Sequence, residues 1–194
     1  MYTTFKLPYE NSFIEARIPT RNITSILHAK NVDGLKDEGQ AITDSLRSPI
    51  GRPPLLDSID KDDKVVVIVT DNTRPCPDDR LLPPILAEIE RKVPRENILI
   101  MIALGMHEPM DRQELIKKLG SNIVDNYSVV NHDVNDCTII GETSTGTPVE
   151  IDNKVLAADF RISTGFIEPH IFAGFSGGRK SIAPGMFGIH SVYK

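Results

Sequence analysis

The sequence predicts an α/β domain in which helices flank a mostly parallel sheet, with a β-hairpin ahead of it at the N-terminus. Two observations indicate this fold class. Residues 65–70 form an uninterrupted β-branched run, which is typical of a strand buried on both faces in a parallel sheet. Further strand-like segments then alternate with segments of helical periodicity, as they do in βαβ units.

The N-terminal part of the chain supplies the predicted hairpin. Residues 3–8 and 13–19 are short alternating runs, and residues 9–12 separate them. Two such runs joined by a short polar segment predict a β-hairpin. Residues 33–48 are rich in helix formers and stop at Pro49, so they predict a helix that ends there.

The strand at residues 65–70 begins a βαβ pattern. After a turn-rich stretch, a helix through about Lys92 is predicted because apolar residues recur at helical spacing, namely Leu82, Leu86, Ile89 and Val93. Residues 97–104 predict a second apolar strand. Asp111 and Glu114 then form a capping-box pattern, and the helix that they begin is expected to end at Gly120.

The remaining segments complete the predicted sheet. Residues 125–131 predict a third strand, and residues 138–151 predict a hairpin that turns at residues 144–146. A short helix over residues 153–158 leads into the last strand, residues 159–164. The arrangement is Rossmann-like, and such sheets bind their ligands outside the carboxyl ends of the strands.

Polar loops follow two of the predicted strands directly. Residues 71–75 contain Arg74, whose planar guanidinium suits a carboxylate or a phosphate, although a helix-capping turn is the simpler interpretation of this loop alone. His107 follows the strand at residues 97–104, where a histidine can face a cleft and transfer protons near neutrality. A solvated turn histidine is an equally good interpretation of this position.

The loop at residues 165–181 follows the last predicted strand and is the richest of the three. Three glycines within residues 174–178 allow a backbone to approach a ligand closely. The loop ends in Arg179-Lys180-Ser181, a near miss to the phosphate-binding P-loop, which has glycine directly before its lysine. An ordinary nucleoside triphosphatase is therefore disfavoured, but a long loop of this kind favours a functional role.

Composition excludes several classes of protein. The 194 residues, 40% of them hydrophobic and 25% charged, fit one globular domain or one domain with a small appendage. The net charge of −5 argues against a non-specific nucleic-acid binder. Cys76 and Cys137 match no zinc-ligand spacing. With neither a signal-peptide pattern nor a run long enough for a membrane helix, a soluble, cytoplasmic protein without nucleic-acid or membrane partners is expected.

Together, the three loops resemble those of the lactate racemase family. The segment EPHIFAGFSGGRKS at residues 168–181, followed by Pro184-Gly185, is long and specific. The motifs at residues 71–75 and 105–107 precede it in the family's order and with similar separations. The similarity extends over nearly the whole chain. It implies that residues 1–194 are the N-terminal catalytic and cofactor-binding domain of a longer enzyme, inactive alone because a second domain contributes substrate contacts.

The resemblance also implies a role for each loop. Lys180 would covalently hold a nicotinate-derived nickel-pincer nucleotide and its nickel. His107 and His170 would be the paired acid/base residues. Four residues would help to bind the cofactor, through its phosphate: Asp71, Asn72, Thr73 and Arg74. Arg74 could also meet the substrate carboxylate, and the sequence does not separate these two roles.

The family's reaction explains why two histidines are needed. The hydrogen on C2 of a 2-hydroxyacid such as lactate is barely acidic, and in this family it leaves as hydride to the nickel cofactor while a histidine takes the hydroxyl proton. The resulting ketoacid reorients and hydride returns to its other face, so each enantiomer needs its own base. The resemblance further implies accessory proteins that make the cofactor.

The other histidines are weaker candidates. The family's nickel-ligating histidine lies farther beyond the lysine than His190, which follows Lys180 by only ten positions, so that ligand is expected beyond residue 194. His132 is expected to be a hydrogen-bonded turn residue, and His28, in an early helical stretch, to lie at the surface. Two alternative functions stay open: racemisation or epimerisation of another 2-hydroxyacid or a sugar acid, and a non-catalytic module that binds a nucleotide or phosphate.

Overall fold

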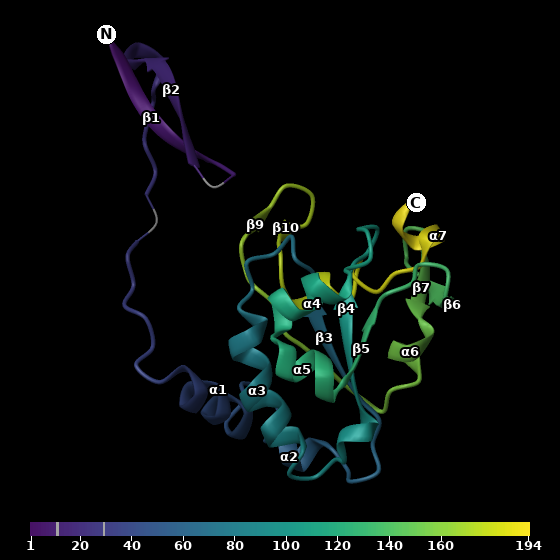
Figure 1. Ribbon diagram of the computed structural model, residues 1–194. Coiled ribbons are helices and arrows are strands. Elements are labelled where there is room, and N and C mark those ends of the chain that lie inside the picture. Colours follow the sequence, from purple (N-terminus) through teal and green to yellow (C-terminus); the bar gives the residue numbers. More distant parts are fainter. Residues whose placement is uncertain (11, 29) are drawn as a thin grey trace. The chain divides into compact units, whose positions relative to one another are not determined.

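The computed structural model describes residues 1–10, 12–28 and 30–194, which form two compact units, residues 1–35 and 36–194. The first unit is the predicted hairpin, in which β1 (Tyr2–Tyr9) pairs antiparallel with β2 (Ser12–Pro19) (Figure 1). A short 3-10 helix, η1 (Thr20–Asn22), follows it. Asn11, within the predicted turn, lies outside the described residues. His28 is exposed as expected, but its segment is not helical.

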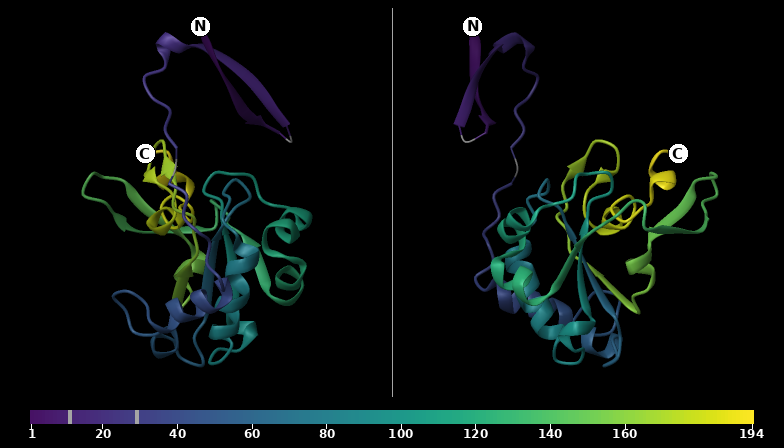
Figure 2. Two further views of the ribbon diagram at one scale, coloured as in Figure 1. Left: turned by 90° about the vertical axis from the view of Figure 1, so that its left-hand side faces the viewer. Right: turned by 45° about the vertical axis from the view of Figure 1, so that its right-hand side comes forward.

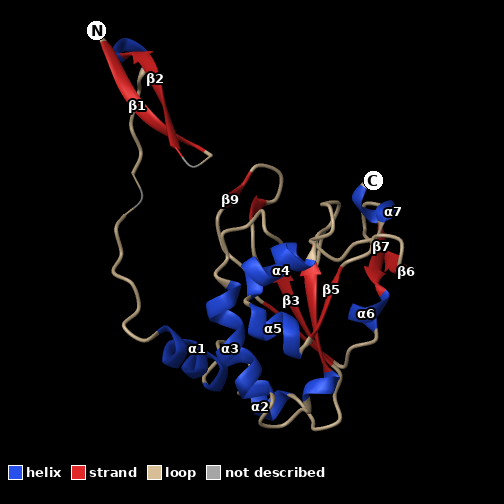
Figure 3. Ribbon diagram, in the orientation of Figure 1, coloured by secondary structure: helices blue, strands red, loops and turns tan. Residues whose placement is uncertain are grey.

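The second unit is built on a four-stranded sheet in which every neighbouring pair is parallel. Its strand order is β5-β4-β3-β8, and helices surround it (Figure 3). The strands are β3 (Val65–Thr70), β4 (Ile98–Ala103), β5 (Ser128–Asn131) and β8 (Phe160–Ser163). The predicted α/β fold with a mostly parallel sheet and an N-terminal hairpin is thus confirmed.

The β-branched run of β3 is buried on both faces, which explains its lack of polar alternation. Val65, Val67 and Val69 pack in one apolar cluster with side chains of α3, α4 and α5, whereas Val66 and Ile68 pack in a second cluster with β7 and α6. Figure 2 shows these elements on opposite sides of the sheet. Burying each such side chain contributes about 1.5–3 kcal/mol, so β3 is a rigid base for the loop that follows it.

The helices of this unit follow their local signals. They are α1 (Glu38–Arg47), α2 (Leu55–Ser58), α3 (Asp78–Ile89), α4 (Arg112–Leu119), α5 (Ser121–Asn126), α6 (Asn153–Leu156) and α7 (Ile189–Val192). The capping box of α4 is present in both directions between Asp111 and Glu114, and α4 ends at Gly120. Among the described residues, no helix is both long and apolar enough to cross a membrane.

Several boundaries differ from the prediction. The third strand begins at Ser128 and not at Asp125, because residues 121–126 form α5, whose Ile123 is buried in the core. The predicted hairpin at residues 138–151 is confirmed as β6 (Cys137–Glu142) and β7 (Pro148–Asp152). Elements too short to leave a periodic pattern were not predicted: α2, η2 (Arg95–Asn97), β9 (Pro169–His170), β10 (Gly174–Phe175), η3 (Gly178–Ser181) and α7.

Candidate active site

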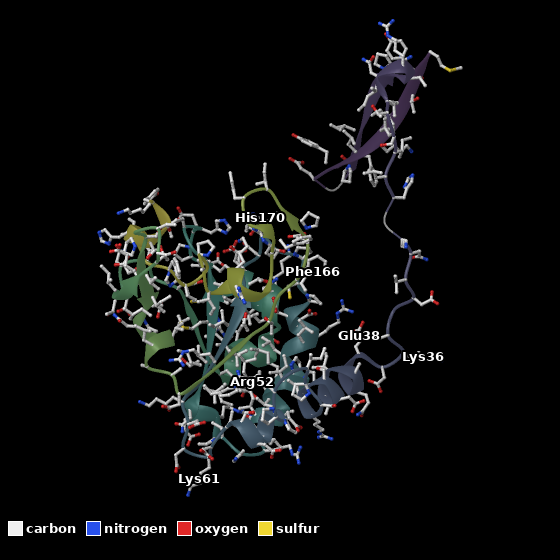
Figure 4. The ribbon with its side chains drawn as sticks, turned by 180° about the vertical axis from the view of Figure 1, so that it is seen from behind. Lys36, Glu38, Arg52, Lys61, Phe166 and His170 are labelled. Carbon is white, nitrogen blue, oxygen red and sulfur yellow. The ribbon has the colours of Figure 1, made fainter. Side chains whose placement is uncertain are left out.

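The strand order defines where a ligand can bind. From β3 the chain adds β4 and then β5 on one side, whereas β8 pairs with the other side of β3. Open parallel sheets bind ligands at the carboxyl ends of the strands, where the strand order changes direction. Figure 4 labels His170, after β8, at one end of this unit and Lys61, before β3, at the opposite end.

A cavity of about 590 Å³ lies at this edge of the sheet, within the usual range for small-molecule sites. Loops after β3, β4 and β8 line it. Five of the predicted site residues are among its lining: Asp71, Arg74, His107, His170 and Lys180. Loops separated by more than sixty positions in the sequence therefore meet here, because the parallel strands before them end at one edge.

Asp71 braces His107. The Asp71 side chain is only 3% exposed, and its Oδ2 is hydrogen-bonded to Nδ1 of His107. Its Oδ1 accepts from the backbone N of Thr73 at 3.0 Å and from Thr73 Oγ1 at 2.6 Å. Because a carboxylate accepts, Nδ1 of His107 carries the proton, and Nε2 of the neutral ring is left with a free lone pair.

The charge on Asp71 is held by its neighbours. Burial alone would raise the pKa of Asp71, but hydrogen bonds from Thr73 and His107, together with attraction to His107, outweigh burial and lower it. Asp71 is therefore ionised near neutrality and can stabilise a positive His107 ring. This gives His107 the local arrangement of a general base.

The turn that carries His107 depends on a glycine. Gly105 has φ of +56°, a conformation that other residues rarely adopt. Its N donates to the carbonyl oxygen of Gly185 at 3.0 Å, and the N of His107 donates to the carbonyl oxygen of Leu104 at 3.0 Å. The loop after β4 is thus joined to the segment that follows Lys180.

His170 is held in the opposite way. It lies on β9, and its Nδ1 accepts hydrogen bonds from the backbone N of Phe172 and of Ala173, both at 3.2 Å. The proton of the neutral ring is therefore on Nε2. Partial burial and the positive charges of Lys180 and Arg74 lower the pKa of His170, and Glu168 only partly opposes them. His170 is accordingly neutral at pH 7 and a donor at Nε2.

Lys180 lies in η3 with its side chain partly buried against the cavity. Burial and the positive charge of Arg74 lower the pKa of Lys180, against the opposing effect of Asp71. A larger share of its amine is thereby uncharged and nucleophilic. Gly177 lies three residues before Lys180 in the same loop. Its φ is +74°, and a Cβ there would lie 3.1 Å from the carbonyl oxygen of Phe166.

Arg74 adds a second basic side chain to the cavity, beside Lys180. Its Nε lies 3.8 Å from Oε1 of Glu168, and its Nη1 donates to the carbonyl oxygen and to Oγ1 of Thr73, both at 3.3 Å. The other N–H groups of the guanidinium suit a carboxylate or phosphate. Sequence reasoning missed Glu168 as the partner of this charge. The only available signal was its position two residues before His170 in the loop at residues 165–181, which does not indicate where a carboxylate points.

Comparison with known proteins decides the family. Residues 9–194 match the lactate racemase N-terminal domain. The chain belongs to this family. The lactate racemases of Thermoanaerobacterium thermosaccharolyticum and Lactiplantibacillus plantarum are each 36% identical to it, over 192 and 191 residues. Both alignments cover 96% of this chain and 45% of the relative, so the chain spans about half the length of the curated relatives it matches.

Solved structures agree with this assignment. The lactate racemase apoprotein from Thermoanaerobacterium thermosaccharolyticum superposes with a TM-score of 0.83 at 36% identity, covering 96% of this chain and 44% of that one. A protein from Thermotoga maritima shares the fold, with a TM-score of 0.62 at 24% identity over 76% of this chain and 38% of that one.

Not every predicted site residue of this lactate racemase family member lines the cavity. The Asn72 side chain donates to Oε1 of Glu114 at 2.8 Å, which joins it to the capping box of α4. Thr73 hydrogen-bonds Asp71. Neither residue is part of the lining, so the structure supports Thr73 as a support for Asp71 and Asn72 as a loop anchor.

Two further histidines, His132 and His190, have structural partners. His132 is buried, with Nδ1 2.9 Å from Oδ2 of Asp152 and Nε2 2.9 Å from the carbonyl oxygen of Phe187. His190 pairs with Glu150, its Nδ1 3.2 Å from Oε1, and is absent from the cavity lining. Within the part of the chain that the structure describes, no group of three or more metal-binding side chains is clustered.

Proposed function

We propose that this chain carries the proton-transfer and cofactor-binding residues of a 2-hydroxyacid racemase that acts on lactate. The observation that supports this most is the convergence of His107, His170 and Lys180 on one cavity, from three separate loops. The names of the relatives point to the same reaction, since both are lactate racemases. The two histidines and the lysine would then serve one substrate.

The residues present suit a nickel-pincer nucleotide. We propose that Lys180 forms the covalent link, because its lowered pKa favours the nucleophilic amine. Arg74 and the Asp71 loop would hold the nucleotide, with Arg74 the group suited to its phosphate or to the substrate carboxylate. When bound, this cofactor supplies the acceptor that takes the C2 hydrogen as hydride and gives it back. Accessory proteins that make the cofactor would be its partners.

The protein side chains handle the proton. His107 accepts the hydroxyl proton of one enantiomer at Nε2, and the buried Asp71 carboxylate stabilises the resulting imidazolium. His170 presents an N–H at Nε2 in the described conformation, which suits a hydrogen bond to the hydroxyl or carbonyl oxygen of the substrate. His170 could serve as the base for the other enantiomer only if its Nδ1 became free to bind a proton. In the described conformation Nδ1 accepts hydrogen bonds from the two backbone amides instead.

The experiment combines a mass measurement with a racemisation assay. The protein in its full natural length is produced with nickel and with the enzymes that make the cofactor, and its intact mass is compared with that of Lys180→Arg. We expect a covalent addition on the parent protein that the variant lacks, together with interconversion of D- and L-lactate. Residues 1–194 produced alone should not interconvert them.

Other outcomes separate the alternatives. A loaded protein that converts another 2-hydroxyacid or a sugar acid, but not lactate, would reassign the substrate and keep the reaction class. An unmodified Lys180 together with reversible nucleotide binding would replace the racemase with a non-catalytic binding module.

A further inference from the structure

A buried ion pair lies beneath the loop that carries Asp71 and Arg74. Lys118 of α4 and Asp78 of α3 are 3.0 Å apart, Nζ to Oδ2, and their side chains are 8% and 0% exposed. Taking two charges out of water is costly, and buried pairs are often no more stabilising than apolar residues of similar size. Such a pair calls for a reason other than stability.

Lys118 holds the backbone of the loop. Besides Asp78, its Nζ donates to the carbonyl oxygens of Arg74 at 2.8 Å and of Cys76 at 3.0 Å. The three donors of the ammonium therefore all have partners. The N of Arg74 also donates to the carbonyl oxygen of Asp71 at 3.3 Å, so Lys118 fixes the end of a turn whose first residue is Asp71.

Asp78 connects the same loop to the ends of β3 and β8, the two strands between which the strand order changes direction. Its Oδ2 accepts from Oγ1 of Thr70 at 3.3 Å, and its Oδ1 accepts from Oγ1 of Thr164 at 2.9 Å. Thr70 ends β3 and Thr164 follows β8. Burial and the Asp78 carboxylate raise the pKa of the Cys76 thiol to about 12, so the thiol keeps its proton and donates to Oδ1 at 3.4 Å.

We propose that Lys118 and Asp78 are positioning residues, which hold the loop at residues 71–77 so that Asp71 meets His107 and Arg74 faces the cavity. The kinetic part of this inference rests on the proposed function; the structural part does not. An apolar pair would fill the same space but could not bind two loop carbonyls and two threonine hydroxyls at once. Functional residues commonly lie on loops that a rigid sheet positions. Here the ion pair between Lys118 and Asp78 holds such a loop in place.

The test compares Lys118→Met with Lys117→Met, its exposed neighbour on α4, and with the double variant Asp78→Asn/Lys118→Met. The racemase in its cofactor-loaded, full-length form is assayed for kcat and KM. We expect Lys118→Met to lower kcat by about 10- to 100-fold, as loss of a supporting hydrogen-bond partner typically does, and Lys117→Met to leave it unchanged. The double variant should recover thermal stability relative to Lys118→Met, because no unpaired charge stays buried, but should not recover kcat.

A second readout is independent of activity. The ¹⁵N chemical shifts of the His107 ring report which nitrogen carries the proton. We expect the Nδ1–H form in the parent protein and in Lys117→Met, and a mixture with the Nε2–H form in Lys118→Met and in the double variant. If the protein proves not to be a racemase, this readout still decides the inference. The inference would be overturned if the double variant kept the kcat or the His107 ¹⁵N spectrum of the parent. It would also be overturned if a folded Lys118→Met protein kept the parent His107 spectrum. If Lys118→Met does not fold, Lys118→Arg replaces it in the same comparison.

Discussion

The loops that carry His107 and His170 face one cavity but are built differently. His107 lies in a short turn directly after β4 and is braced by Asp71, whose side chain is 3% exposed. His170 lies on the two-stranded β9–β10 hairpin, whose tip residues Ile171 and Phe172 are 90% and 92% exposed. One imidazole is fixed by a buried carboxylate, and the other by two backbone amides at an exposed tip.

This difference gives the two rings opposite hydrogen-bonding roles. Nδ1 donates in His107 and accepts in His170, so Nε2 is an acceptor in the first ring and a donor in the second. In these positions, His107 can take a proton directly. His170 can donate a hydrogen bond, but it cannot release its Nε2 proton near neutrality without forming an imidazolate. Two histidines that line one cavity need not be equivalent bases.

The largest effect is expected for His107→Ala in the loaded, full-length protein. Removing the braced base should lower the racemisation rate by about 10²- to 10⁴-fold, the usual contribution of general acid–base catalysis. His170→Ala should also lower the rate, and in both directions, because the forward and reverse reactions of a racemisation share their transition states. The initial rate is measured separately from D- and from L-lactate, and full activity of both single variants in both directions would rule out the pairing.

Asp71→Asn tests the brace without removing the base. The asparagine amide can donate to Nδ1 of His107, which moves the ring proton to Nε2 and removes the free lone pair. We expect a loss of about 10²- to 10⁴-fold in kcat, as for other orienting carboxylates, with KM changed less. The ring ¹⁵N shifts of His107 should change and those of His170 should not. A variant with parent kcat would show that Asp71 does not set the His107 tautomer.

Phe172→Pro tests the opposite arrangement at His170. It removes one of the two amide donors to Nδ1, so the neutral ring is less favoured and the pKa of His170 should rise. One hydrogen bond is worth about 0.5–1.5 kcal/mol, which corresponds to a rise of about one unit or less. Titration by NMR measures it, with Ile171→Pro as the control because it removes a neighbouring amide instead. Equal titration curves for the two variants would contradict the assigned hydrogen bonds.

The smallest expected effect concerns stability at low pH. The pKa of Asp71 is lowered in the folded chain, so its stabilising contribution is complete above the ordinary aspartate pKa of about 3.9 and is lost as the pH falls below it. The melting temperature of the parent should therefore exceed that of Asp71→Asn most clearly at pH 5–7. The two curves should converge below about pH 4. A difference that grows toward low pH would have the wrong sign for an ionised, hydrogen-bonded Asp71.

The sequence predicts the sheet and the edge where the cavity lies because both follow from local patterns. An uninterrupted β-branched run requires burial on both faces, and parallel strands deliver their following loops to one edge. The same reasoning placed Asp125 in a strand, because residues 125–131 show no signal that separates a short helix from an extended segment. The packing of Ile123 in the core is what favours the helix α5 over an extended segment.

Side-chain directions within the loops could not be predicted in the same way. Asn72 and Arg74 are two positions apart, yet the first turns to Glu114 and the second lines the cavity. The tautomers of the two histidines depend on single hydrogen bonds, and the contact between Asp78 and Lys118 joins residues forty positions apart on different helices. Such contacts follow from tertiary packing, which leaves no periodic signature in the chain.

The strand order also sets a sequence of events during synthesis. β3 pairs with β4, and β4 pairs with β5, so three of the four strands lie within residues 65–131. The other neighbour of β3, β8, begins only at Phe160, opposite Val65. The Lys180 loop emerges later still. Synthesis therefore produces the strands and loops that carry Asp71 and His107 before those that bring Lys180 to the cavity, so any covalent modification of Lys180 would come after all four strands have been made.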